Sequence, residues 1–275
     1  MFPLLQLGPY AVQVPGLILI VSLWLSLNVA EKEAKRQQFR PELIYSLVFY
    51  AVVTGIVGAR LWYVGRYLDT YLDSPLEIVA LNTNTLAPVA GIGIALLTMI
   101  LYAQWKRLPL RSTLDILAPG LAFFAVGLSL ANLASGDAFG AVTRLPWAIY
   151  LWDENRHPSQ AYEILLSVAI FILLWRYRKL SPFPGFIFLA WLSLAASARI
   201  FLEAFRGDSV IVAGGIRQAQ LAGLVVLLLA LWLMRQWWPE AEPSLANESS
   251  SYADYEMQEH TSVYDHEPDA FYTKH

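Results

Sequence analysis

Three charged side chains stand in an apolar segment near residue 200, and their spacing points most directly to chemistry. Arg199 and Glu203 are four residues apart, and Arg206 is seven from Arg199, so all three share one stripe of a helix. A guanidinium group binds phosphate through two parallel hydrogen bonds, and a carboxylate pairs with it or acts as a base. The pattern indicates an anion-binding or catalytic site. A structural ion pair between Arg199 and Glu203 is the alternative.

Four further polar side chains are expected at the same depth as this stripe. Arg60 and Asn132 lie near the ends of two other apolar segments, and Arg156 and His157 come just before a third. Charged groups inside a membrane span are expensive, so their convergence at one level predicts a functional site. The alternatives are that Arg60 reaches the membrane surface, that Asn132 bonds a neighbouring helix, and that Ser159 is a helix N-cap.

Seven apolar segments are long enough to carry these residues across a membrane. Hydrophobic residues make up 57% of the 275 residues and charged residues 15%, and the mean hydropathy is +0.47. A soluble domain carries about 25% charged residues, and a span needs roughly 20 apolar residues. The sequence therefore predicts an all-α, polytopic membrane protein with about seven transmembrane helices, at residues 11–30, 43–65, 84–105, 114–134, 159–177, 183–205 and 216–237.

The loops between these segments predict an orientation. Basic residues gather after the first, third and fifth spans, and Arg235 lies at the end of the seventh. Such basic segments face the cytoplasm. We therefore expect the N-terminus outside, the C-terminus in the cytoplasm, and the polar side chains in the outer leaflet. Residues 112–115, STLD, match a capping box, which predicts that the fourth helix begins there. Residues 1–8 lack Lys and Arg, so the first segment is interpreted as a retained span, not a cleaved signal peptide.

The end of the chain differs in composition from the seven-span domain, residues 1–237. Residues 238–275 hold nine acidic residues and one Lys, together with several aromatic residues. Such a segment buries too little apolar surface to fold alone, and it is either a solvated tail or a peptide that docks a protein partner. The chain has no Cys, and His157 is the only His before residue 238. We therefore expect no metal, no cofactor and no nucleic-acid partner.

Several stretches carry recognisable motifs. Arg156–Glu163 reads RHPSQAYE, Arg199–Arg206 reads RIFLEAFR, Gly58–Val64 reads GARLWYV and Asp115–Pro119 reads DILAP. In these stretches the chain resembles the bacterial prolipoprotein diacylglyceryl transferases, whose motifs include Arg-His-Pro-Ser-Gln-x-Tyr-Glu, Arg-x-x-x-Glu-x-x-Arg and Gly-x-Arg-x-x-Tyr-Val. The order and spacing of the motifs agree over about residues 5–237.

The resemblance implies a reaction and a place for it. Members of this family transfer a diacylglyceryl group from phosphatidylglycerol to the lipobox cysteine of a lipoprotein precursor, at the outer face of the bacterial inner (cytoplasmic) membrane. By resemblance, the partners are phosphatidylglycerol and the lipoprotein precursor. The catalytic residues implied are Arg199, Glu203 and His157. The substrate-binding residues implied are Arg60, Asn132, Asp137, Gly140, Arg156 and Arg206.

The chain departs from the family pattern at three functional positions. The signature Arg-x-Gly-Asn-x-x-Asn-Gly-Glu-x-x-Gly aligns with Ser129–Gly140, SLANLASGDAFG, so Ser129 stands in place of the leading Arg. The family's His-Gly-Gly segment aligns with Pro88–Gly91, which has no His, and Pro15 stands where a Tyr is expected. Two functions remain open: a divergent transferase, or a catalytically lapsed lipid-binding subunit of a larger membrane complex. A transporter is less well supported, because the polar groups gather at one leaflet.

Overall fold

The computed structural model describes residues 4–7, 10–73, 75–78, 85–151, 153–212 and 215–239, with side chains from Gln13 onwards except at 70, 73, 75 and 76. The chain divides into two units, Met1–Trp237 and Trp238–His275. The fold and the candidate site belong to the first unit. Residues 240–275 lie outside the described residues, so the interpretation of residues 238–275 as a solvated or docking segment stays a prediction.

Among the described residues, seven helices are long and apolar enough to cross a membrane, which confirms the predicted all-α, polytopic fold. The largest difference from the predicted spans is in the first helix, which continues to Arg36 because the charged residues after the apolar run are still helical. The seven helices are Val14–Arg36 (α1), Pro41–Arg66 (α2), Pro88–Trp105 (α4), Leu110–Ser135 (α5), Ser159–Tyr177 (α6), Phe186–Glu203 (α7) and Gln218–Trp237 (α8).

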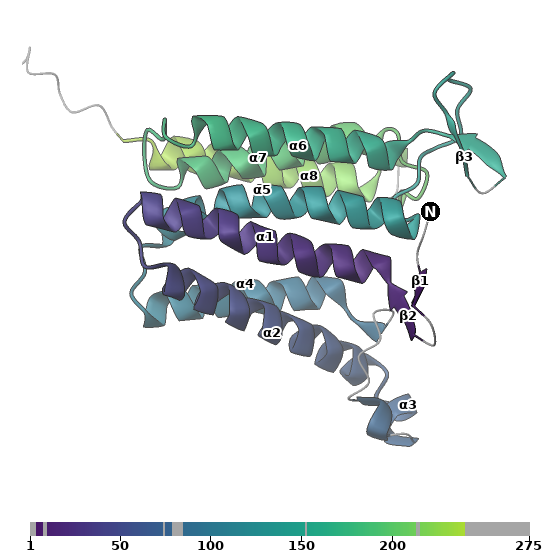
Figure 1. Cartoon of the computed structure of the whole chain (residues 1–275), viewed down its shortest axis with the longest axis horizontal. Helices are drawn as coiled ribbons and strands as arrows, with labels where there is room; N and C mark the ends of the chain where they lie inside the picture. The colour runs from purple at the N-terminus through teal and green to yellow at the C-terminus, as the bar shows by residue number, and fades with distance from the viewer. Residues whose placement is uncertain are drawn as a thin grey trace, which may run out of the picture. The chain divides into compact units, whose positions relative to one another are not determined.

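Short elements extend the bundle at one end, and the sequence analysis predicted none of them (Figure 1). They are the helix α3 (Leu68–Asp73), the 3-10 helix η1 (Pro75–Ile78), the antiparallel strands β1 (Leu4–Leu7) and β2 (Tyr10–Gln13), and the antiparallel strands β3 (Ile149–Leu151) and β4 (Glu154–Arg156). Helices α2, α5 and α7 also terminate at this end, which we call the Glu203 end. The opposite end, where α1 terminates, is the Arg36 end.

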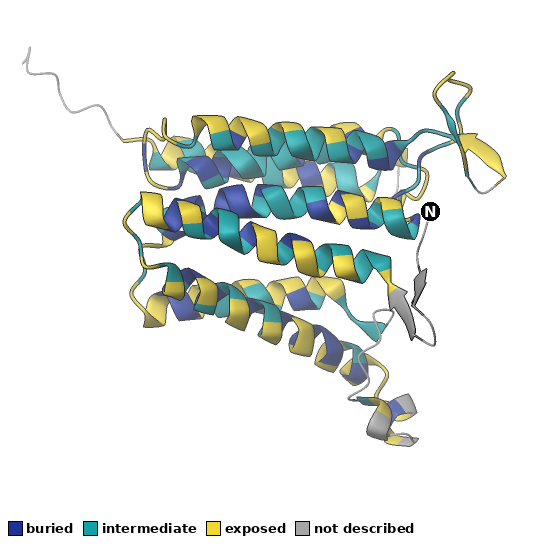
Figure 2. Ribbon diagram, viewed as in Figure 1, coloured by how far each residue is buried: buried dark blue, intermediate teal, exposed yellow. Residues whose placement is uncertain are grey.

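Helix α5 is the best-buried helix of the bundle (Figure 2). Within its most apolar window 56% of the residues are buried, against 11–33% in the other six spans. It packs against α1 on one side and against α6 and α7 on the other. A Cβ on Gly127 would lie 2.0 Å from Ser22 Oγ of α1, so only glycine permits this approach of the two helices. All seven helices, α5 included, expose apolar side chains, as lipid-facing helices do.

Asp115 of α5 has a different role from the predicted one. Helix α5 begins at Leu110 without a side-chain cap, so the capping box predicted at 112–115 is wrong. The Asp115 carboxylate instead accepts hydrogen bonds from the backbone N–H groups of Gly185 (2.6 Å) and Phe188 (2.9 Å). These donors belong to the start of α7, whose first N–H groups have no partner within the helix. Asp115 thereby caps a neighbouring helix and fixes the position of α7 along its axis relative to α5.

Candidate functional site

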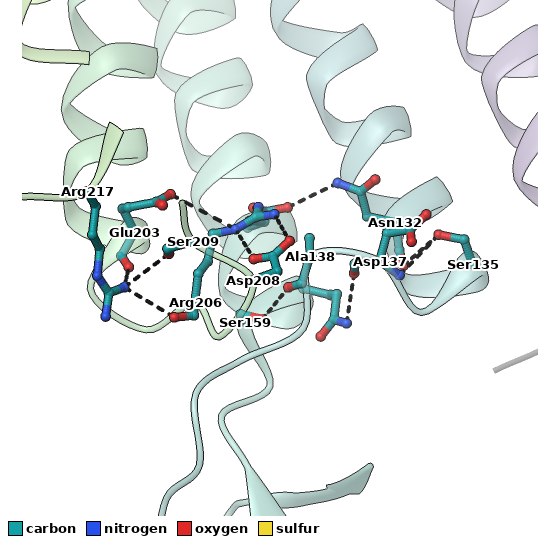
Figure 3. Close-up of polar contacts among 12 residues, drawn as sticks. Asn132, Ser135, Asp137, Ala138, Ser159, Glu203, Arg206, Asp208, Ser209 and Arg217 are labelled. Atoms are coloured by element: carbon teal, nitrogen blue, oxygen red, sulfur yellow. Dashed lines mark hydrogen bonds and ion pairs between the residues drawn. The ribbon is translucent and has the colours of Figure 1, made fainter. Parts of the chain in front are cut away.

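Five side chains form a chain of ion pairs at the Glu203 end, and we call them the ion-pair cluster. Figure 3 labels three of them, Glu203, Arg206 and Asp208. Arg199 Nη2 lies 3.3 Å from Glu203 Oε2, and Arg199 Nη1 lies 3.6 Å from Glu163 Oε1. Arg206 Nη1 donates to the same oxygen of Glu163 at 2.7 Å. Its other nitrogens, Nε and Nη2, donate to the two carboxylate oxygens of Asp208 at 2.9 and 2.6 Å. The cluster therefore joins α6, α7 and the segment after α7.

The end of α7 is shaped by a third arginine. Arg217, just before α8, donates through Nη1 to the carbonyl oxygens of Glu203 and Arg206 and to Ser209 Oγ. The last carbonyls of a helix lack partners within it, and a guanidinium group can satisfy them. Figure 3 shows these bonds from the Arg217 guanidinium. Arg217 thus fixes the backbone on which Glu203 and Arg206 sit.

Burial differs sharply within the cluster. Glu203 is 1% exposed and Glu163 is 8% exposed, whereas the side chain of Arg199 is 42% exposed. Burial alone lowers the pKa of Arg206. The hydrogen bonds to Asp208 and the charges of Glu163 and Glu203 outweigh burial and raise that pKa above its ordinary value. Arg206 therefore stays charged and pairs with Glu163, whereas the charged side chain of Arg199 is partly exposed.

A cleft of about 280 Å³ opens beside Arg199 between α5, α6 and α7. Asn132, Glu163 and Arg199 form its polar end, and Asn132 Nδ2 donates to Glu163 Oε2 at 3.4 Å. Its remaining walls are apolar or small: Ala122, Ala125, Leu128, Ser129, Leu166, Ser167, Ile170, Trp191, Ala195, Ala198 and Leu202. A cation at the head of a narrow apolar cleft suits an amphipathic ligand with a negative head group.

The segment after α5 lies directly against the cluster. It pairs with the end of α7 through the bridge Gly140–Arg206, and with β4 through the bridge Val142–Arg156. The N–H of His157 also donates to the carbonyl of Ala141 at 3.0 Å. A Cβ on Gly140 would lie 2.1 Å from the His157 carbonyl oxygen, so this approach requires glycine. Gly140 therefore acts here through its backbone.

The other predicted residues of this region make no ion pair with the cluster among the described residues. The Arg156 guanidinium donates to the carbonyl of Leu151 (3.2 Å) and to Glu154 (2.6 Å). The His157 ring lies 5.3 Å from the Phe205 ring, and its Nδ1 is buried without a hydrogen-bond partner among the described residues. The side chain of Asp137 is exposed, and its backbone carbonyl accepts a bond from Gln160. Ser159, weighed above as an N-cap, donates to the carbonyl of Ala138 and caps no helix.

Arg60 lies apart from the cluster. It is 6% exposed, and its guanidinium donates to the backbone carbonyls of Glu77, Ile78 (3.1 Å) and Thr85 (2.9 Å). It also stacks on the ring of Tyr71 at 5.2 Å. These contacts hold the connection between α2 and α4. The structure therefore brings Arg199, Glu203, Arg206 and Asn132 together, but not Arg60.

Known proteins with similar sequences identify the family. The family profile described as prolipoprotein diacylglyceryl transferase matches residues 3–236. The chain belongs to the prolipoprotein diacylglyceryl transferase family. It is 29% identical over 262 residues to the phosphatidylglycerol–prolipoprotein diacylglyceryl transferase of Synechococcus sp. (strain CC9902), covering 86% of this chain and 91% of that protein. The transferase of the same name from Lactobacillus johnsonii is 27% identical over 247 residues, covering 84% and 89%. The resemblance inferred from the motifs is confirmed.

The departures from the transferase pattern can now be placed. Ser129, where the family signature has Arg, is 5% exposed and lines the cleft. Its hydroxyl donates to the carbonyl of Ala125 at 3.0 Å and lies 3.3 Å from Ser167 Oγ. Pro15 occupies the first turn of α1, where proline fits because its missing N–H has no partner there. Val89, in the segment that lacks the family His, is 84% exposed.

Two residues of the candidate site were missed by sequence reasoning. Glu163 was quoted within a motif without a role, although an acid in an otherwise apolar span is itself a functional signal. The structure places it between Arg199 and Arg206. Arg217 gave no comparable signal, because it lies outside every motif and acts on backbone carbonyls fourteen and eleven residues away.

Proposed function

We propose that this protein is a phosphatidylglycerol–prolipoprotein diacylglyceryl transferase of the bacterial inner membrane. The observation that carries the proposal is the half-exposed Arg199, held by two buried carboxylates at the head of an apolar cleft. Membership of the transferase family supports it, as do relatives of that name. The cleft accommodates part of a lipid acyl chain, and the planar Arg199 guanidinium binds the phosphate through its N–H groups.

The distribution of charge supports an orientation for this site. Eleven basic residues lie in the loops and helix turns of the Arg36 end: Lys32, Lys35, Arg36, Arg40, Lys106, Arg107, Arg111, Arg176, Arg178, Lys179 and Arg235. Basic loops stay in the cytoplasm. The Glu203 end then faces outward, with the N-terminus on the outer side and the C-terminus in the cytoplasm. An acceptor cysteine of an exported precursor would reach the cluster from this outer side.

The reaction needs only the two substrates to balance. The acceptor thiol loses its proton, and its sulfur attacks the diacylglyceryl carbon that carries the phosphate ester. A sulfur–carbon bond forms as the carbon–oxygen bond breaks, and glycerol phosphate leaves with the electron pair. Negative charge grows on the departing phosphate, where a fixed guanidinium stabilises it most. In the proposed mechanism Arg199 provides that charge. Glu163 and Glu203 hold Arg199 in position, and Arg206 holds Glu163.

Two groups can receive the thiol proton. Glu203 Oε2 is buried and has no hydrogen-bond partner in the described part of the chain, although Arg199 lies 3.3 Å away. His157 Nδ1 is also without a partner in that part. We assign the proton to Glu203, because it lies within the ion-pair cluster and His157 makes no ion pair there. Asn132, Asp137, Gly140 and Arg156 are assigned to shaping the substrate-binding side of the site.

A rescue experiment tests the proposal. The chain is expressed in a bacterium depleted of its own transferase, and precursor maturation is followed by the gel mobility of a lipoprotein. The unmutated chain and Arg144→Gln, an exposed control at the same end, are expected to restore maturation, and Arg199→Gln is not. If the unmutated chain is inserted at normal levels and restores nothing, the proposal fails. The alternative of a lipid-binding subunit would then be supported.

A further inference from the structure

A second cavity, of about 560 Å³, lies away from the ion-pair cluster. It is a groove between the end of α2 and the start of α4, so it belongs to the Glu203 end of the bundle. None of its lining residues lines the cleft beside Arg199. We call it the α2–α4 groove. The proposed reaction leaves this groove without a role.

The walls of the groove change in character along its length. Toward the middle of the bundle they consist of Gly93, Ile94 and Leu97, and toward the end they carry aromatic residues and one cation. The full lining is Trp62, Tyr63, Arg66, Tyr67, Ala87, Pro88, Val89, Ala90, Gly93, Ile94 and Leu97. A Cβ built on Gly93 meets no atom within 4 Å, so there is open space directly over this residue. An apolar floor with an aromatic rim is the pattern of a site at the membrane interface.

The groove has a fixed frame. Helices α2 and α4 touch where a Cβ on Gly91 would lie 2.9 Å from the carbonyl oxygen of Gly55. The N–H of Ala87 donates to the carbonyl of Ala59 at 3.2 Å, which ties the start of α4 to α2. Arg60 holds the connecting segment through the carbonyls described above. A groove framed by direct backbone contact keeps its shape when empty, which lowers the conformational cost of binding.

Arg66 gives the groove a charge. It is the last residue of α2, it lines the groove, and its side chain is exposed. Among the described residues it makes no ion pair and no hydrogen bond, unlike Arg60, Arg156, Arg199, Arg206 and Arg217 at the same end. An unpaired cation above an apolar groove attracts an anionic head group whose tail can lie in the groove. Tyr63 and Tyr67, whose ring centroids lie 4.8 Å apart with the rings tilted by 44°, also line the groove and carry hydroxyl groups.

We propose that the α2–α4 groove binds one glycerophospholipid of the leaflet at the Glu203 end, separately from the cleft beside Arg199. The phosphate lies at Arg66, and one acyl chain runs over Gly93 toward Leu97. A peptide helix would bring apolar side chains but no phosphate for Arg66. A diacylglycerol would fill the groove equally well and leave Arg66 unused. Phospholipid is the occupant that matches both the charge and the apolar floor.

The sequence offers a matched pair of substitutions for the test. Gly93→Phe places a ring in the open space of the groove. Gly65→Phe places the same ring on α2, where a Cβ also meets nothing within 4 Å but does not line the groove. Both changes put Phe on an exposed helix position, so they share any general effect on helix stability. Equal thermal unfolding temperatures of the two variants would show that both are folded.

Native mass spectrometry of delipidated protein measures the bound lipid directly. We titrate the unmutated chain, Gly93→Phe, Gly65→Phe and Arg66→Gln with phosphatidylglycerol, phosphatidylethanolamine or dioleoylglycerol. Gly93→Phe is expected to bind one phospholipid fewer than Gly65→Phe, and Arg66→Gln to bind the second phospholipid several-fold more weakly. Dioleoylglycerol is expected to bind at this site more weakly than either phospholipid.

Three results would overturn the proposal. They are equal stoichiometry for Gly93→Phe and Gly65→Phe, an unchanged affinity in Arg66→Gln, or dioleoylglycerol binding as tightly as phospholipid. Arg199→Gln separates this site from the proposed active site, since it removes lipid from the first cleft only. A chain that retains the Gly93-dependent lipid but lacks transferase activity would support this inference and contradict the proposed function.

Discussion

Replacing Glu163 by Gln removes a buried negative charge that faces two arginines. Its side chain is 10% exposed, and Oε1 lies 2.7 Å from Arg206 Nη1 and 3.6 Å from Arg199 Nη1. Breaking a buried ion pair by removing one partner costs about 3–5 kcal/mol. Arg206 keeps Asp208, and Arg199 keeps Glu203 at 3.3 Å, so we expect about half of that cost, ~2 kcal/mol. This corresponds to a fall in unfolding temperature of about 4–8 °C.

Glu154→Gln is the matched control, because it makes the same change in an exposed pair. Glu154 lies 2.6 Å from Arg156 Nη2, as close as the buried pair, but its side chain is 49% exposed. Exposed ion pairs contribute about 0–1 kcal/mol. Thermal unfolding in mild detergent should therefore separate the two variants by several degrees. Equal shifts for Glu163→Gln and Glu154→Gln, or a more stable Glu163→Gln, would refute the reasoning that burial gives the cluster its strength.

Two further changes test the frame and the tail. Asp115→Ala removes the cap that α5 provides to α7, and we expect it to lower the free energy of unfolding by ~1–2 kcal/mol. Asp115→Asn should lower it less. Thermal unfolding measures both variants, and an unchanged unfolding temperature in Asp115→Ala would contradict this role. Deletion of residues 238–275 is expected to leave phospholipid binding unchanged and to reduce co-purification with a protein partner, measured by size-exclusion chromatography in mild detergent. A truncated chain that elutes with the same assembly as the full chain would show that the tail docks nothing.

The membrane fold follows from the sequence because a span is a local property. Each of the seven helices forms its backbone hydrogen bonds within its own segment, so length and apolar content are enough to predict it. The hairpin β3–β4 escaped prediction because its strands have only three residues each. Asp115 escaped for a different reason. Its partners are N–H groups 70 and 73 residues away, and no local pattern distinguishes such a cap from a cap on its own helix.

The candidate site was predictable where spacing along one helix decides the contact. Arg199 and Glu203 form the predicted i, i+4 pair. Depth in the membrane was a weaker guide, because Arg60 was expected beside this pair and is held instead by the backbone between α2 and α4. Depth fixes one coordinate only, and the packing of the helices decides which residues at that depth meet. For the same reason, the sequence did not predict that Glu163 lies between two arginines.

Transfer measured with purified components tests the central claim most directly. The protein is mixed with phosphatidylglycerol labelled in its acyl chains and with a peptide that contains a lipobox cysteine. The unmutated chain and Arg144→Gln should attach the label to the peptide, and Arg199→Gln should lower the rate at least about 100-fold, the loss typical of removing one transition-state donor. Transfer by Arg199→Gln at the unmutated rate, or no transfer by the folded, lipid-bound unmutated chain, would contradict the account.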